Sequence, residues 1–212
     1  MAKAPAGKLW VVAAPSGAGK TSLVRALLER DPTLRFSISY TTRARRSSEQ
    51  DGRDYFFVTE QRFREMVRRG EFLEHAQVFD NWYGTGRDHV AGLLAAGSSV
   101  VLEIDWQGAR QVRERAPESQ SIFILPPSVA ELERRLRGRQ TDSDAVIARR
   151  LRDAQSDMTH WHEFDHVVVN DDFAAALDRL AAVIAGRSPH TRTSAPEVRA
   201  AAAAILAGKP AK

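Results

Sequence analysis

A glycine-rich stretch near the N-terminus carries residues that could bind phosphate groups. It runs from Ala14 to Thr21, APSGAGKT, between an apolar run and a helical pattern. Glycines let a backbone curl so that its N–H groups point at phosphate oxygens, and the following helix adds a partial positive charge. The Lys20 ammonium could bridge the β- and γ-phosphates, and the Thr21 hydroxyl could hold Mg²⁺. The stretch predicts a nucleoside triphosphate site, although Ala14 replaces the glycine of the strict pattern.

The lysine of this stretch stands apart from the other basic residues. From Leu9 to Gly208 every basic position is arginine except Lys20. A compact ammonium and a planar guanidinium are not interchangeable at a binding site. The single retained lysine therefore strengthens the prediction of a phosphate loop over that of an ordinary glycine-rich turn.

A second group of residues could bind another anion and a base. The segment TTRARR, residues 41–46, places several guanidiniums in a loop, and Tyr55 follows it. Arginine forks match phosphate oxygens bidentately, and a tyrosine hydroxyl can donate beside them. Glu74 and the segment NWYGT, residues 81–85, come later. Taken singly, these residues would equally suit a solvated loop, a surface strand and a packing aromatic.

The elements that must position these residues alternate between strands and helices. Buried strands are predicted at Leu9–Ala14, Ser99–Ile104, Ser121–Leu125 and His166–Asn170. Helical periodicity predicts helices at Thr21–Arg30, Val129–Arg137 and Asp144–Met158, and another from Phe173 to Ile184 behind a possible cap at 170–172. This alternation predicts an α/β fold, an open parallel sheet with helices on both faces.

Two regions depart from the alternation. Residues 36–96 predict a small mixed α/β insertion, with strands at Phe36–Thr41, Tyr55–Val58 and Glu71–Val78 and a helix at Glu60–Arg69. Residues 187–212 are rich in Ala, Pro and Arg and predict a flexible tail, with a short helix as the alternative.

Composition limits the class of protein. The chain has 212 residues, 43% hydrophobic and 27% charged, which is ordinary for a globular domain. No apolar run reaches the ~20 residues that cross a bilayer, so we expect no membrane partner. The chain contains no cysteine, which predicts a cytoplasmic location and excludes disulfides. A net charge of +4 suits anionic partners without specifying their kind.

The motifs taken together resemble the guanylate kinase family over residues 8–186. They are APSGAGKT, SxTTR, RDYFF, FLEHAQV, YGT, EIDWQGA, ILPPS, RLRGR, ARRL and VVNDDF, in this order, with x standing for one residue. The resemblance implies phosphorylation of GMP by MgATP and leaves open whether dGMP is also an acceptor. It also implies three parts: a phosphate-loop core at 8–35 and 97–186, a GMP-binding insertion at 36–96 and a helical lid at 137–160.

Residue roles follow from the resemblance by position. In the GMP site, phosphate binding is implied for Arg43, Arg46, Tyr55 and Tyr83, and guanine binding for Ser39, Glu74, Thr85 and Asp105. ATP binding is implied for Ala14, Pro15, Ser16, Gly17, Ala18, Gly19, Lys20, Thr21 and Asn170. Catalytic charge neutralisation is implied for Lys20, Arg135, Arg139 and Arg150, although helical periodicity alone would make these arginines solvent-facing.

The chemistry of guanine agrees with these roles. Guanine presents N1–H and N2–H₂ donors beside its O6 acceptor, so a site for it needs a carboxylate and a hydroxyl. Adenine has an acceptor at N1 that would face the Glu74 carboxylate, and the unpaired polar groups would penalise its binding.

Two departures from the family pattern concern the site. Glu103 replaces a more usual aspartate, and its carboxylate could still serve Mg²⁺ through water. Gln140 follows Arg139 where glycine is common, which bears on how freely the lid bends.

The segment HEFDH, residues 162–166, matches the H-E-x-x-H pattern of zinc proteases. That chemistry needs both histidines on one helical face, whereas His166 opens the predicted strand. We therefore interpret the segment as a surface stretch at the lid hinge and not as a metal site.

Two other functions are compatible with the same fold and phosphate loop. One is a binding-only scaffold module, which the intact Lys20, Thr21 and lid arginines disfavour. The other is a phosphate-loop kinase with a ribosyl bisphosphate acceptor, which the set of Ser39, Glu74, Thr85 and Asp105 disfavours. Nucleic-acid binding is not expected, because two phosphate sites account for the arginines, and the sequence leaves the oligomeric state open.

Overall fold

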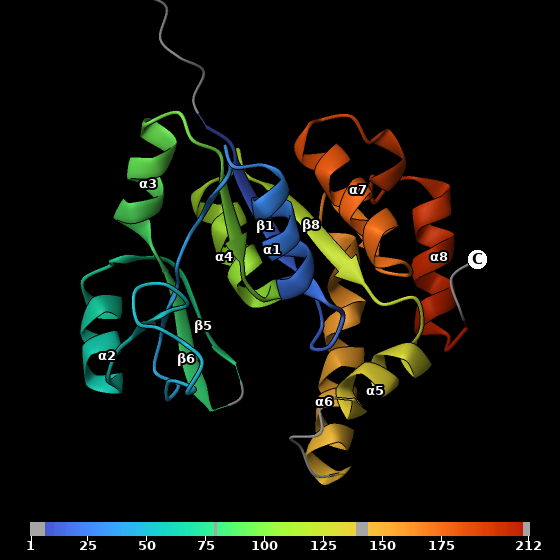
Figure 1. The fold of residues 1–212 in the computed structure, drawn as a ribbon, viewed down its shortest axis with the longest axis horizontal. Helices are drawn as coiled ribbons and strands as arrows, with labels where there is room; N and C mark the ends of the chain where they lie inside the picture. The colour runs from blue at the N-terminus through green and yellow to red at the C-terminus, as the bar shows by residue number, and fades with distance from the viewer. Residues whose placement is uncertain (1–6, 79, 139–143, 210–212) are drawn as a thin grey trace, which may run out of the picture. The chain divides into compact units, whose positions relative to one another are not determined.

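The computed structural model describes residues 7–78, 80–138 and 144–209 and has an α/β fold (Figure 1). A five-stranded parallel sheet, flanked by helices, has the strand order β2-β7-β1-β8-β9. Its strands are β1 (Leu9–Ala13), β2 (Arg35–Phe36), β7 (Val100–Glu103), β8 (Gln120–Leu125) and β9 (His166–Val169). The predicted fold class and the four predicted core strands are confirmed, each strand within about two residues of its expected bounds.

The chain forms two compact units. The first unit contains the residues through Val11 and those from Pro32 to Ser119, and the second contains Val12–Asp31 and the residues from Gln120 onward. The division into core, insertion and lid that the resemblance implies is a functional one, and its boundaries stay a prediction.

The first unit contains a second sheet, of four strands in the order β4-β3-β6-β5. These are β3 (Tyr40–Thr41), β4 (Phe56–Phe57), β5 (Phe72–Val78) and β6 (Asn81–Gly86), and the unit's helices are α2 (Glu60–Arg68), α3 (Arg87–Ala95) and α4 (Trp106–Arg115). The buried side chains of Phe63 and Met66 on α2 pack against Phe72 on β5. This cluster fixes the strand that carries Glu74.

The single strand predicted at Phe36–Thr41 is two strands with different partners. Phe36 pairs with Val101 in the five-stranded sheet, whereas Thr41 pairs with Tyr83 in the four-stranded sheet. The chain changes sheets between them, which a continuous apolar pattern cannot show. Strand β6 was not predicted because Gly84 and Gly86 weaken its strand signal.

The second unit contains the four helices that were predicted outside the insertion. They are α1 (Lys20–Arg30), α5 (Val129–Arg137), α6 (Asp144–Met158) and α7 (Phe173–Ile184), and they match their predicted bounds within one residue. Asp172 is the N-cap of α7 and accepts a hydrogen bond from the Ala175 N–H, so the predicted cap is confirmed. None of the helices that the structure describes is long and apolar enough to cross a membrane.

The C-terminal segment is ordered through residue 209, in contrast to the expected flexible tail. It contains a short 3₁₀ turn, η2 (Pro189–Thr191), and helix α8 (Pro196–Leu206). Val198, Ala202 and Ile205 are buried at helical spacing, which the alanine-rich composition conceals. The Thr191 hydroxyl also bonds with the buried His166 Nδ1 at 2.8 Å. The alternative of a short helix is therefore the one that the structure has.

Candidate active site

The phosphate loop joins β1 to α1 in the second unit. Gly17 and Gly19 have φ values of 90° and 93°, in the left-handed region that favours glycine. Gly19 is the N-cap of α1, so Lys20 and Thr21 open the helix. The loop therefore has the strand–turn–helix context that a phosphate loop requires, with the helix N-terminus directly behind its glycines.

Two side chains of the second unit hold the loop backbone. The Asn170 amide donates from Nδ2 to the Ala18 carbonyl oxygen at 2.7 Å, and Asn170 is buried. Arg135 donates to the same carbonyl at 3.3 Å and to the Asn170 carbonyl oxygen at 3.0 Å. A Cβ on Gly19 would lie 2.4 Å from Asn170 Nδ2, so only glycine allows this approach. In the structure Asn170 thus acts on the shape of the loop.

The arginines of α5 are held by carboxylates on the same helix. Glu131 accepts hydrogen bonds from Arg134 at 2.7 Å and from Arg135 at 2.8 Å. The bond from Arg134, followed by that from Arg135, holds the pKa of Glu131 at about 2. Glu131 is therefore ionised at neutral pH and orients the Arg135 guanidinium toward the loop.

The structure describes only one of the other two arginines expected at the ATP phosphates. Arg150 lies half-buried on α6. Arg139, together with the departure at Gln140, lies outside the described residues. Their roles stay predictions.

The expected guanine site lies in the first unit and has a buried carboxylate at its centre. Glu74 on β5 pairs in register with Thr85 on β6, and the Thr85 hydroxyl donates to Glu74 Oε1 at 2.5 Å. Their exposed fractions are 3% and 0%. A buried carboxylate is costly unless hydrogen bonds compensate it. Glu74 is therefore a buried, hydrogen-bonded carboxylate and not an exposed residue of a surface strand.

Asp105 lies close to this pair at the start of α4. It is the N-cap of the helix, and its Oδ1 accepts from the Gly108 N–H at 2.7 Å. A Cβ built on Gly108 would lie 2.5 Å from Glu74 Oε2 and 3.3 Å from Asp105 Oδ1, so both carboxylates border this glycine. The structure thus brings together Glu74, Thr85 and Asp105, whereas Ser39 is placed just before β3 and half-buried.

The expected phosphate-binding residues of the first unit also lie together. The Arg43 guanidinium is 5.5 Å from the centre of the Tyr55 ring, and the rings of Tyr55 and Tyr83 are 6.0 Å apart. Burial, followed by the negative charge of Glu103, raises the pKa of Tyr55 to about 12. The Tyr55 hydroxyl therefore stays protonated and can donate to an anion.

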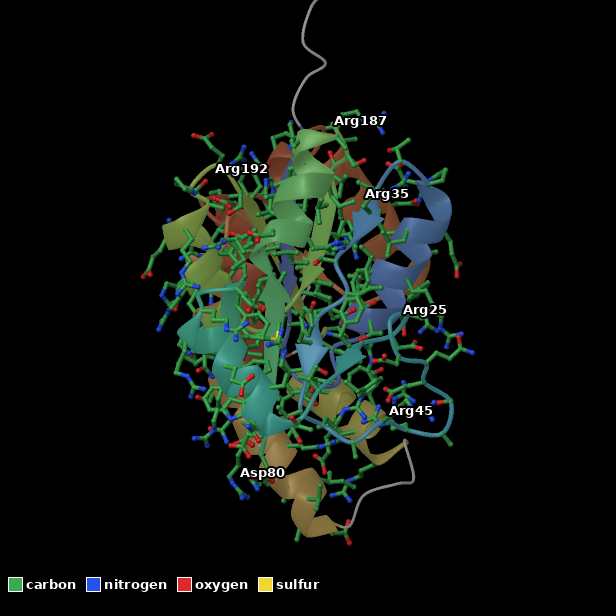
Figure 2. The ribbon with its side chains drawn as sticks, turned by 90° about the vertical axis from the view of Figure 1, so that its left-hand side faces the viewer. Arg25, Arg35, Arg45, Asp80, Arg187 and Arg192 are labelled. Atoms are coloured by element: carbon green, nitrogen blue, oxygen red, sulfur yellow. The ribbon has the colours of Figure 1, made fainter. Side chains whose placement is uncertain are left out.

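Glu49 organises this arginine loop and was not predicted. It accepts from Arg43 Nη2 at 2.7 Å and from the Arg46 backbone N–H at 2.8 Å. Burial lowers the pKa of Arg43, but the hydrogen bond to Glu49, the charge of Glu49 and the nearby Tyr83 together outweigh burial and raise that pKa. Arg45, on the exposed loop between β3 and β4 (Figure 2), donates to the Glu49 carbonyl oxygen at 2.7 Å. The sequence signal that could have identified Glu49 is that a single acidic residue closely follows three arginines.

The histidine pattern at 162–166 is divided between two elements. His162 lies in the 3₁₀ turn η1 (Thr159–Glu163), and His166 opens β9, which confirms that the pair does not share a helix. His166 is buried, and not on the surface as expected. Among the described residues, no three His, Cys, Asp or Glu side chains gather as a metal site.

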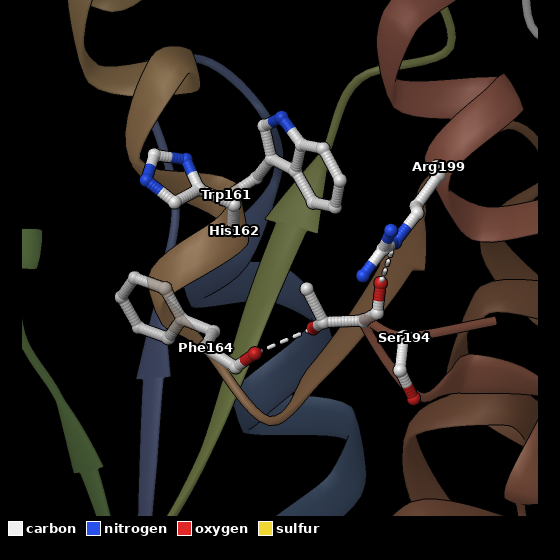
Figure 3. A pocket seen from close by; sticks show the side chains of 6 residues that line it. Trp161, His162, Phe164, Ser194 and Arg199 are labelled. Atoms are coloured by element: carbon white, nitrogen blue, oxygen red, sulfur yellow. Dashed lines mark hydrogen bonds between the residues drawn. The ribbon is translucent and has the colours of Figure 1, made fainter. Parts of the chain in front are cut away.

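A separate hollow of about 510 Å³ lies in the second unit (Figure 3). Trp161, His162, Phe164, Thr193, Ser194 and Arg199 line it. No residue expected to bind ATP is among them. The hydrogen bond from the Thr193 hydroxyl to the Phe164 carbonyl oxygen ties the C-terminal segment to the residue that ends η1, and the bond from Arg199 to the Thr193 carbonyl oxygen lies within that segment.

Comparison with known proteins decides the family of this site. The guanylate kinase family model matches residues 6–187. The chain belongs to the guanylate kinase family. A guanylate kinase of Chromohalobacter salexigens is 55% identical over 95% of this chain and 92% of its own. One of Dechloromonas aromatica is 59% identical over 84% and 89%.

A solved guanylate kinase agrees at the level of the fold. The crystal structure from Anaplasma phagocytophilum has a TM-score of 0.72 and 34% identity, and it covers 88% of this chain and 89% of its own. The resemblance to the guanylate kinase family is thereby confirmed. The family model ends before η2 and α8, so these elements lie outside the matched residues.

Proposed function

We propose that this member of the guanylate kinase family transfers the γ-phosphoryl group of ATP to GMP and gives ADP and GDP. The observation that carries the choice of acceptor is the buried pair of Glu74 and Thr85 beside Asp105. A buried carboxylate there suits the N1–H and N2–H₂ donors of guanine. Because the Thr85 proton is donated to Glu74, the Thr85 oxygen can accept from guanine but not donate to it at the same time.

The phosphate of GMP would bind to Arg43, Arg46, Tyr55 and Tyr83. Arg43 carries the permanent charge of a guanidinium and is oriented by its bond to Glu49, and Tyr55 remains protonated. These groups supply the guanidinium and hydroxyl donors that a phosphate dianion takes. Ser39 would complete the base site with its hydroxyl.

In the transfer, an oxygen of the GMP phosphate attacks the γ-phosphorus of ATP, and the bond to the β–γ bridging oxygen breaks. The attacking oxygen is already anionic at neutral pH, so the reaction needs no general base. Lys20 and the backbone N–H groups of the phosphate loop would neutralise charge on the phosphates. Arg135, just before a lid at 137–160, and Arg139 and Arg150 within this lid would add positive charge as the lid closes, and the closure would also exclude water.

The oxygen donors of the chain fit a magnesium ion that accompanies ATP. Thr21 presents an exposed hydroxyl in the first turn of α1, and Glu103 ends β7 half-buried. Mg²⁺ in such sites takes one or two protein oxygens and fills its remaining positions with phosphates and water. Thr21 would bind it directly and Glu103 through water. When bound, it would neutralise charge on the β- and γ-oxygens.

Product analysis tests the proposal. MgATP is supplied with GMP, dGMP, AMP, dTMP or ribose 1,5-bisphosphate separately, and ADP and the second product are identified by chromatography. We expect rapid conversion of GMP to GDP, and a much slower conversion of AMP or dTMP to the corresponding diphosphate. Turnover with ribose 1,5-bisphosphate alone would overturn the guanine site. Tight GMP binding without turnover of any acceptor would indicate a binding module instead.

A further inference from the structure

Helix α4 presents a strip of three residues to the strand that carries Glu74. Gly108, Gln111 and Arg115 follow one another at spacings of three and four residues, which places them on one face of the helix. Each of them contacts β5 at or next to Glu74, as the following contacts show. Gly108 has appeared so far only as the donor to Asp105 and the neighbour of both carboxylates, and Gln111 and Arg115 have no role in the site as described. We call them the α4 strip.

Gly108 gives the Glu74 carboxylate its room. The 2.5 Å between a built Cβ and Glu74 Oε2 is far below an ordinary contact. The same Cβ would be 3.1 Å from the Glu74 carboxyl carbon, so the whole group would have to move. The backbone of Gly108 meanwhile donates to Asp105. The absence of a side chain at this position thus lets Glu74 and Asp105 share the helix N-terminus.

Gln111 holds the β5 backbone on the C-terminal side of Glu74. Its Oε1 accepts from the His75 N–H at 3.2 Å, and its Nε2 donates to the His75 carbonyl oxygen at 2.7 Å. A side-chain amide that uses both its donor and its acceptor on one residue fixes the position and rotation of that residue. Because His75 follows Glu74 directly, this pairing fixes the direction in which Glu74 leaves the strand.

Arg115 holds the backbone on the N-terminal side of Glu74. The register of β5 against β6 shifts between Phe72 and Glu74, which makes Leu73 the extra residue of a bulge. Arg115 Nη1 donates to the Leu73 carbonyl oxygen at 2.7 Å. A bulge can re-aim the side chain that follows it, and here that side chain is Glu74.

We propose that the α4 strip positions Glu74 and thereby sets the selectivity of the site for guanine. The inference rests on the proposed function, in which Glu74 accepts hydrogen bonds from the guanine base. The bulge turns Glu74 inward, Arg115 and Gln111 fix the backbone on both sides, and Gly108 leaves space for the carboxylate. Gly108, Gln111 and Arg115 are positioning residues, because they act through Glu74.

The first test replaces Gly108 with alanine and compares it with Gly92→Ala. Gly92 lies within helix α3, and a Cβ there meets nothing within 4 Å, so it is a matched control for a helix glycine. In Gly108→Ala the carboxylate must move by roughly 1 Å to reach an ordinary separation. We expect the KM for GMP to rise ~10- to 100-fold, with the KM for ATP unchanged. Gly92→Ala should leave both values unchanged.

A double-variant cycle separates positioning from general damage. Glu74→Asp shortens the side chain and withdraws the carboxylate from the added methyl group. Gly108→Ala should therefore raise the KM for GMP by less than ~3-fold in the Glu74→Asp background, against ~10-fold or more in the parent. Equal effects in both backgrounds would overturn the inference.

Arg115 provides a second test should Gly108→Ala fold poorly. Arg115→Lys keeps a donor for the Leu73 carbonyl oxygen, whereas Arg115→Met keeps only the aliphatic stem. We expect Arg115→Met to raise the KM for GMP and the relative rate with AMP, and Arg115→Lys to restore most of both. Identical behaviour of the two variants would contradict the role of the strip.

Failure of the inference is distinguishable from failure of the proposed function. The unaltered protein is assayed first with GMP, and no turnover of GMP there would overturn the proposed function and this inference with it. Turnover of GMP by the unaltered protein, together with Gly108→Ala kinetics equal to those of Gly92→Ala, would overturn the α4 strip alone.

Discussion

The residues that we propose to read the base, in the first unit, and those that we propose to bind the ATP phosphates, in the second unit, are built in different ways. Glu74 and Thr85 are buried and already paired across two strands. Lys20 and Thr21 instead open a helix, half-buried and exposed respectively, and Arg135 and Arg150 are half-buried on α5 and α6. A buried, oriented acceptor discriminates between bases, since a wrong base leaves it unpaired. An exposed cationic site attracts any phosphate.

From this difference we expect selectivity for the acceptor to depend on one region and the rate of transfer on the other. Substitutions in the Glu74 region should change which acceptor is used and the KM for GMP. Substitutions around the phosphate loop should change kcat or the KM for ATP and leave the choice of acceptor intact.

The largest effect is expected from Lys20→Met. Loss of the ammonium removes charge stabilisation of the transferring phosphoryl group, so kcat should fall on the order of 10³-fold. The Kd for GMP, measured by calorimetry, should remain unchanged. Lys20→Arg should not restore the rate, because a planar guanidinium replaces a compact charge. Lys8→Met, at an exposed position, is the control. A Lys20→Met protein with nearly full kcat would remove the distinction between the two regions.

Glu74→Gln should affect the choice of acceptor most. Thr85 would still donate to the amide oxygen, so the new NH₂ group would face the N1–H and N2–H₂ donors of guanine. We expect kcat/KM for GMP to fall ~10²- to 10³-fold and the preference for GMP over AMP to shrink. Steady-state assays with each acceptor measure this, and the KM for ATP should not change. Glu60→Gln, an exposed residue on α2, should match the unaltered protein. Unchanged selectivity in Glu74→Gln would place base reading elsewhere.

Asn170→Ala should weaken ATP binding because the phosphate loop loses a hydrogen bond that holds its backbone in shape. The variant loses the donor to the Ala18 carbonyl, which should lower the free energy of unfolding by about 1–3 kcal/mol and raise the KM for ATP roughly tenfold. Thr191→Val is the matched control, since it removes another buried hydrogen bond of the same unit, to His166. It should lower the Tm comparably but leave the KM for ATP unchanged. An equal change of KM in both variants would indicate general loosening.

Much of the fold could be predicted because its signals are local. The apolar runs at β1, β7, β8 and β9 and the periodicity of α1, α5, α6 and α7 predicted these elements to within about two residues. The division of residues 36–41 between two sheets could not be predicted, because it depends on Val101 and Tyr83, which lie far away in the sequence. The burial of α8 could not be predicted, because its many alanines do not form a clear apolar pattern along the helix.

The candidate site was predicted as a set of residues but not as an arrangement. Motif resemblance gave Glu74, Thr85 and Asp105, whose proximity the structure shows. Glu49, Gly108, Gln111 and Arg115 were missed, because their roles come from contacts with other side chains or with the backbone of a distant strand. Asn170 was expected to bind ATP, and the structure shows its amide bonded to the Ala18 carbonyl oxygen of the loop, a contact that no pattern in the sequence indicates.

The smallest effect is expected from Glu131→Gln, which tests how much an ion pair contributes to the phosphate region. Arg135 would lose the partner that orients it, but this pair is only half-buried and water still screens it, so the KM for ATP should rise only about two- to fivefold. The folded pKa of Glu131, about 2, lies below its ordinary value. Its stabilising contribution is therefore present above pH ~4.5 and is lost as the pH falls toward 2.

Glu131→Gln lacks this contribution at every pH. The difference in Tm between the unaltered protein and the variant should therefore be larger near pH ~7 than near pH ~3.5. For Glu29→Gln, at an exposed position on α1, the difference in Tm from the unaltered protein should not become smaller as the pH falls. A Tm difference that stayed constant with pH would mean that Glu131 orients Arg135 by shape and not by charge. The phosphate region would then be as preorganised as the buried Glu74 pair, and the contrast between the two regions would weaken.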